Sequence, residues 1–154
     1  MRYCDRGFTL LELMVVLIIL ALLGSLAVPR LTPVADRVRL EADAQEMAGL
    51  LRLARQEAIS TGQPQTVLFY PYGGIYRLQG GKSYPLRSGV GYLGTTTFGS
   101  AYPGGPPGCT FYPTGAVGPR AGTVTLHNQG GERLYVVVNP VVGRVRVSEQ
   151  APQS

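Results

Sequence analysis

The sequence has few of the side chains from which catalytic and metal centres are built. Its 154 residues include one histidine, His127, and two cysteines, Cys4 and Cys109. A structural zinc site made only of cysteine and histidine uses four ligands, so one chain cannot supply it. A Ser-His-Asp arrangement is possible only with His127 as its base. The composition therefore disfavours an enzyme, and we expect neither a cofactor nor a bound metal.

Charge is also scarce, whereas glycine and proline are abundant without being periodic. Charged residues make up 15% of the chain, below the roughly 25% that is usual for soluble domains. The 21 glycines and 12 prolines follow no repeat, which excludes a collagen-like triple helix. The glycine-rich stretch 99–108 lacks the Lys-Ser/Thr pair of a phosphate-binding loop, so we give it no nucleotide role.

The hydrophobic residues gather near the N-terminus. Residues 13–28 read LMVVLIILALLGSLAV without a charge, and the extension back to Phe8 adds only Glu12. A helix over residues 8–28, at about 1.5 Å per residue, is roughly 31 Å long, which matches the hydrocarbon core of a bilayer. The segment is therefore either a transmembrane helix or a secretory signal peptide.

The signal-peptide interpretation has some support. Arg2 and Arg6 give a positive N-terminal region, and Ser25-Leu26-Ala27 offers small residues near a plausible cleavage point. Against it, the apolar run is long for a signal peptide, and Glu12 lies inside it. An ionisable side chain is costly in an apolar segment and is usually there for a reason.

The residues before and around Glu12 form a specific motif. After a seven-residue leader with two arginines, the segment Gly7-Phe8-Thr9-Leu10-Leu11-Glu12 closely resembles the signal of type IV prepilins and type II secretion pseudopilins. The resemblance implies cleavage after Gly7 by a prepilin peptidase and N-methylation of Phe8. It also implies a filament of such subunits, in which Glu12 meets the amine of a neighbour's Phe8, because a buried carboxylate needs a partner. Pro29 matches the helix kink of that family.

A second role for Glu12 stays open, because its side chain can reach the cytoplasmic headgroups before assembly. The resemblance further implies a single pass through the inner membrane, with the N-terminus in the cytoplasm and the C-terminal domain in the periplasm before filament assembly. Charge supports this orientation only weakly. Asp5 reduces the leader to a net charge of +1, and Arg30, Arg37 and Arg39 follow the apolar segment.

A second helical pattern follows the apolar segment. Pro29 is expected to break or kink the first helix, and Thr32-Pro33 to restart it as N-cap and first helical residue. The pairs Arg37–Glu41 and Arg39–Asp43 are four residues apart, which allows weak ion pairs across solvent. One apolar stripe at steps of three and four is expected to pack on a sheet: Leu40, Ala44, Met47, Leu51, Ala54 and Ala58.

Beyond Gly62 the hydrophobic period changes to two, which indicates strands. The alternation predicts strands over residues 66–70, 75–78, 123–127, 134–138 and 145–147, with shorter candidates at 84–86 and 110–112.

The C-terminal half carries a second resemblance. The segments Phe111–Gly115, Gly122–Leu126, Val136–Val138 and Gly143–Arg146 resemble the GspH/FimT family of minor pseudopilins and minor pilins. The resemblance implies an α+β fold in which a long N-terminal helix packs on a C-terminal, antiparallel β-sandwich-like domain of two small sheets. We expect four parts: a leader peptide (1–7), a transmembrane or filament-core helix (8–28), an amphipathic helix (29–61) and a globular β domain (62–154).

Positive charge is concentrated in the expected β domain. Residues 58–154 carry six arginines, one lysine and two glutamates, whereas residues 8–57 carry five arginines and six acids. Such a concentration of positive charge is typical of a domain that binds an anionic partner.

Arg144 and Arg146 share a face if they lie on one strand, and Arg133 and Tyr135 of the preceding strand are expected on the same face. Guanidinium groups beside a tyrosine suit phosphate contact with base stacking.

The element Gly143-Arg144-Val145-Arg146 also resembles the Gly-Arg-x-Arg element that is associated with DNA binding in FimT-like proteins. The resemblance implies DNA as a partner in natural transformation. The alternative is a solvated, protective face, since charged residues on an edge strand oppose edge-to-edge aggregation. Thirteen of the fourteen basic residues are arginine, which indicates a chain-wide bias. A type II secretion pseudopilus subunit that binds no DNA is therefore the second hypothesis.

His127 and Cys109 are reactive side chains, but we expect structural roles for both. His127 is expected at a strand end as a surface or capping residue. Cys109 is left without an intramolecular partner once the leader that carries Cys4 is removed, and we expect a small buried residue; an intermolecular disulfide is the other option.

Overall fold

The computed structural model describes residues 9–118 and 122–152, and its first element is one long helix. Helix α1 (Leu10–Thr61) runs through both of the compact units into which the chain divides, Met1–Ala35 and Asp36–Ser154. Gly7 and Phe8, where we expect cleavage, lie outside the described residues.

Helix α1 begins at a threonine cap. Thr9 Oγ1 accepts a hydrogen bond from the backbone N–H of Glu12 at 3.2 Å, which satisfies one of the donors that a helix N-terminus leaves without an intrahelical partner. Glu12 lies in the first turn, where a negative charge interacts favourably with the helix dipole. From Leu10 to Leu23 the side chains of the helix are exposed.

In the part of the chain that the structure describes, no helix is both long enough and apolar enough to cross a membrane. The expected transmembrane segment over residues 8–28 is thus not confirmed.

The helix does not break at its prolines, so the predicted restart at Thr32-Pro33 is wrong. Helix α1 continues through Pro29 and Pro33. A proline inside a helix removes one N–H donor and crowds the carbonyl four residues earlier. Ending a helix and starting another would leave up to about four N–H and four C=O groups without intrahelical partners. The continuous helix therefore satisfies more of the backbone than a break would.

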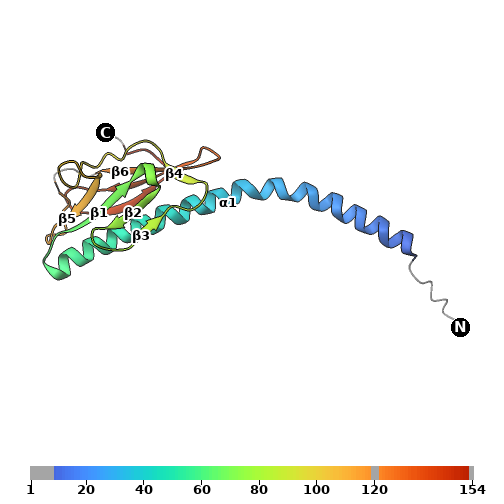
Figure 1. The fold of residues 1–154 in the computed structure, drawn as a ribbon, viewed down its shortest axis with the longest axis horizontal. Coiled ribbons are helices and arrows are strands. Elements are labelled where there is room, and N and C mark those ends of the chain that lie inside the picture. Colours follow the sequence, from blue (N-terminus) through green and yellow to red (C-terminus); the bar gives the residue numbers. More distant parts are fainter. Residues whose placement is uncertain (1–8, 119–121, 153–154) are drawn as a thin grey trace. The chain divides into compact units, whose positions relative to one another are not determined.

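Two four-stranded antiparallel sheets lie alongside the part of α1 that follows Asp36 (Figure 1). The first sheet has the order β3-β2-β1-β5, and a 3₁₀ turn (Pro71–Gly73) joins β1 to β2. Its strands are β1 (Gln65–Tyr70), β2 (Ile75–Leu78), β3 (Ser83–Pro85) and β5 (Gly108–Phe111). The second sheet has the order β4-β6-β7-β8, with strands β4 (Val90–Tyr92), β6 (Thr123–Asn128), β7 (Arg133–Val138) and β8 (Val145–Ser148). The predicted α+β fold, a helix packed on two small antiparallel sheets, is confirmed.

One hydrophobic core joins the helix to both sheets. All six residues of the predicted apolar stripe are buried, none more than 1% exposed. They share a core with alternate residues of both sheets: Val67, Phe69, Phe111, Val124, Leu126, Val136 and Val138. Cys109 lies in this core, as predicted, and burial raises the pKa of its thiol to about 12.

Two details of the fold differ from the sequence-based expectations. Strand β4 was not predicted, because its three residues include a central glycine and show no alternation. The pair Arg39–Asp43 does not form: Arg39 contacts Asp36 at 3.3 Å instead. Asp43 is 1% exposed and accepts hydrogen bonds from the backbone N–H (2.9 Å) and the side chain of Arg87. The loop between β3 and β4 therefore supplies the partner of this buried carboxylate.

Candidate functional site

The predicted arginine pair lies at the edge of the second sheet. Strand β8 ends the sheet order and pairs with β7, with Val145 opposite Val138 and Arg146 opposite Val137. Val145 is buried, whereas Arg146 on β8 and Arg144 just before it are exposed. The predicted alternation is confirmed, and both arginines line one shallow hollow of about 410 Å³.

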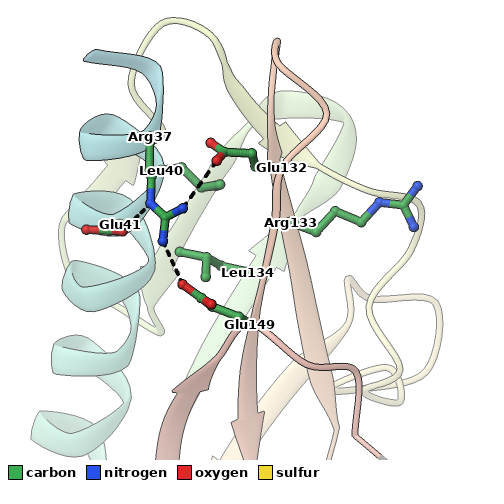
Figure 2. A pocket seen from close by; sticks show the side chains of 7 residues that line it. All are labelled: Arg37, Leu40, Glu41, Glu132, Arg133, Leu134 and Glu149. Carbon is green, nitrogen blue, oxygen red and sulfur yellow. Dashed lines mark hydrogen bonds and ion pairs between the residues drawn. The ribbon is translucent and has the colours of Figure 1, made fainter. Parts of the chain in front are cut away.

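The other two predicted residues, Tyr135 and Arg133, share the outer face of this sheet but lie at different distances from Arg146. Tyr135 is opposite Ser148, which places it diagonally next to Arg146, about 7 Å away. Arg146 lies opposite Val137, and Arg133 is four residues from Val137 along β7, a distance of about 13 Å. The side chain of Arg133 points away from α1 (Figure 2). The structure therefore brings Tyr135 to the arginine pair and leaves Arg133 at the far end of the strand.

Gly143 fixes the turn that precedes both arginines. Its φ angle of 61° is in the left-handed region, and a Cβ atom there would lie 2.1 Å from the carbonyl oxygen of Gly115. Within the turn, Gly143 N–H donates to the Asn139 carbonyl at 3.0 Å, and Asn139 N–H donates to the Arg144 carbonyl at 2.9 Å. The backbone contact leaves no room for a side chain, so the turn requires glycine at the first position of the Gly-Arg-x-Arg element.

A second hollow, of about 500 Å³, adjoins the first, and Arg144 lines both. Its lining includes two arginines from helix α1, Arg52 and Arg55. No residue that lines either hollow is acidic. The sequence analysis missed Arg52 and Arg55 because it counted charge by segment, and residues 8–57 contain more acids than bases. Their spacing of three residues, off the apolar stripe, is the signal that could have singled them out.

The opposite end of β8 is rich in carboxylates, which pair within the chain. Arg37 of α1 contacts Glu41 at 3.0 Å, Glu132 at 3.4 Å and Glu149 at 2.7 Å (Figure 2). The hydrogen bond with Glu41 and the charges of all three carboxylates raise the pKa of Arg37. Asn128 also donates to Glu132, at 2.7 Å. This cluster connects the helix to the open end of the β7–β8 pair, opposite the turn, and its one arginine and three carboxylates carry a net negative charge.

The reactive side chains considered in the sequence do not form a second site. His127 is half-buried, and its Nδ1 lies 3.1 Å from the carbonyl oxygen of Asn128. Across residues 9–118 and 122–152, no group of three or more histidine, cysteine or acidic side chains could hold a metal ion. Glu12 is exposed in the first turn of α1.

Comparisons with known proteins agree with this architecture. Residues 43–141 match the family described as type II transport protein GspH, and residues 2–28 match the prokaryotic N-terminal methylation motif. The type II secretion system protein H of Xanthomonas campestris pv. campestris is 40% identical over 76 residues, which are 49% of this chain and 45% of that protein. The chain thus spans less than half the length of this curated relative.

Two solved structures share the fold. The type IV minor pilin FimU of Pseudomonas aeruginosa superposes with a TM-score of 0.59 at 18% identity, over 79% of this chain and 98% of that one. The minor pseudopilin EpsH of the Vibrio cholerae type 2 secretion system gives a TM-score of 0.57 at 18% identity, over 71% and 96% of the two chains.

These matches define the chain as a structural protein of the pilin and pseudopilin class, not an enzyme. Because the family match covers more than half of its residues, the chain belongs to the GspH family, and it carries the N-terminal methylation motif of such proteins.

Replacing Gly143 tests the turn. We expect Gly143→Ala to lower the free energy of unfolding by about 3 kcal/mol, because it adds a clash with the Gly115 carbonyl to the strain of a left-handed alanine. Gly131→Ala is the matched control: its φ is 82°, but nothing lies within 4 Å of the added Cβ, so about 1 kcal/mol is expected. Urea unfolding measures both. Equal losses would mean that the turn moves aside freely.

Proposed function

We propose that the chain is a minor pilin or pseudopilin, processed and N-methylated by a prepilin peptidase and assembled with other pilins or pseudopilins into a filament. The observation that carries the proposal is the presence in one chain of the methylation motif (2–28) and the GspH match (43–141). The exposed apolar side chains of α1 between Leu10 and Leu23 support it, because such a surface needs lipid or neighbouring helices to cover it.

In this proposal the segment 8–28 anchors the chain in the inner membrane before assembly. The N-terminus then lies in the cytoplasm, and the β domain lies in the periplasm until the subunit joins an extracytoplasmic filament. Glu12 is exposed in the first turn of α1, where it can meet the methylated amine of a neighbour's Phe8. Its place three residues after the Thr9 cap suggests a local role as well, at the positive end of the helix.

The finer part of the proposal is DNA binding through Arg144 and Arg146, for natural transformation. Both side chains are exposed, and neither has an ion-pair partner within the described residues. Tyr135 lies beside them on the same face and can stack on a base. Arg133 is too far along β7 to join this contact, so we assign it at most a separate phosphate.

The second candidate function is a type II secretion pseudopilus subunit without DNA binding. It is favoured by the curated relative, a type II secretion system protein H, and by the position of β8 at a sheet edge. Exposed arginines on an edge strand oppose pairing with another sheet. The DNA measurement below separates the two functions.

Processing can be tested directly on the mature protein. We expect mass spectrometry to find an N-terminus at Phe8 that carries one methyl group, because Gly7-Phe8 and Glu12 complete the prepilin signal. An N-terminus at Val28 would instead establish a secretory signal peptide and overturn the proposal.

The charge of Glu12 can be separated from its position in the helix. Glu12→Gln keeps a side chain that can complete the helix cap but removes the charge, whereas Glu12→Ala removes both. We expect both variants to enter the membrane and both to be poorly incorporated into filaments, as measured by immunoblots of sheared filaments. Normal incorporation of Glu12→Gln would show that the pairing with an amine is not needed.

DNA binding is tested by a salt titration with a short fluorescent duplex and the full chain in a non-ionic detergent. Arg144→Gln with Arg146→Gln should flatten the plot of log affinity against log salt by about two units, since each phosphate contact contributes about 0.9. Arg39→Gln with Lys82→Gln changes the net charge equally and should leave the slope unchanged. Identical slopes for the wild type and the Arg144/Arg146 variant would support the edge-protection function.

A further inference from the structure

We infer that Arg52 and Arg55 of α1 extend the DNA-binding surface, so that the phosphate backbone of a duplex runs from β8 across the β7–β8 turn onto the helix. This inference rests on the proposed DNA binding by Arg144 and Arg146. It adds a helix to a surface that the sequence analysis placed on two neighbouring strands alone.

The two hollows at this end of the sheet are linked by one shared residue. Arg144 lines both of them, with Arg52 and Arg55 on one side and Arg146 on the other. Four arginines therefore face adjoining hollows that have no acidic lining residue. Four cations that are spread over a helix and a strand suit a polymer of phosphates better than a small anion, which a single arginine pair could hold.

The two helix arginines are held in place without losing their charge. Arg52 Nη2 donates to the carbonyl oxygen of Val145 at 3.4 Å, and Arg55 Nε donates to that of Gly115 at 3.2 Å. Each guanidinium has five N–H donors, so these bonds leave most of them available. A carbonyl is neutral and does not cancel the positive charge. The bonds therefore fix the direction of the side chains and leave their charge for a ligand.

Other arginines on the same part of the helix are used differently. Arg37 contacts three carboxylates, and Arg39 contacts Asp36. Within the described residues, Arg52 and Arg55 have no carboxylate within ion-pair distance. Among the described arginines of α1, the two without a carboxylate partner thus lie beside the β7–β8 turn, next to Arg144 and away from the carboxylates around Arg37.

The test compares four full-length variants in the same salt titration with the same duplex. They are Arg52→Gln/Arg55→Gln, Arg144→Gln/Arg146→Gln, the combination of all four, and the control Arg39→Gln/Lys82→Gln. We expect each arginine pair to lower the slope by about two units and the quadruple variant by about four. The control should bind as the wild type does.

A fifth variant separates charge from support of the turn. Arg52→Lys/Arg55→Lys keeps both charges but not the geometry of the guanidinium groups. If the helix arginines contact phosphates, the lysine variant should keep a salt slope close to that of the wild type. Loss of slope in the lysine and glutamine variants alike, together with a lower melting temperature by circular dichroism, would mean that the two arginines only support the turn.

The outcomes distinguish this inference from the proposed function. If the Arg144/Arg146 pair changes the slope and the Arg52/Arg55 pair does not, the inference is overturned and the proposed function stands. If the wild-type chain does not bind, or if neither pair changes the slope, both are overturned.

Discussion

The second unit of the chain depends on the burial of one helix face in a core that it shares with two sheets. The stripe from Leu40 to Ala58 contributes small and medium side chains, so the helix approaches both sheets closely and all three share one core. Each sheet has only four strands and cannot bury its own inner face. Helix α1 supplies eight of the 21 buried residues that the structure describes in this core, so a displacement of this part of the helix would disturb both sheets.

Much of this fold could be predicted because the spacing of hydrophobic residues along the sequence follows which side chains are buried. The stripe of α1 and the alternation of β6 and β7 are strong patterns, and the structure follows them. Local signals were less reliable. Thr32-Pro33 has the composition of a helix start, yet the surrounding helix continues through it. Asp43 has the spacing of a surface partner for Arg39, but it faces the loop that contains Arg87. The first outcome follows from backbone hydrogen bonding along the helix, and the second from a contact with a segment that is distant in the sequence.

The candidate site was predictable only within one pair of neighbouring strands. Alternation placed Arg144 and Arg146 on one face correctly, but it could not say that the turn before them lies against α1. Charge counted by segment hid Arg52 and Arg55, because acids elsewhere on the helix outnumber them in the sum. In the folded chain four of the six acids, Asp36, Glu41, Asp43 and Glu46, pair with Arg37, Arg39 and Arg87 elsewhere in the structure. Electrostatic surfaces follow the distribution of charge in space, which a linear sum does not describe.

The close packing of Gly143 on Gly115 has a consequence for the energetics of recognition. A flexible loop that becomes ordered on binding loses about 1–2 kcal/mol of backbone entropy for each residue that is fixed. Here the turn is already held by backbone contacts and by hydrogen bonds at Asn139. The arginine backbone is thus preorganised during folding, so a partner needs to restrict only side chains.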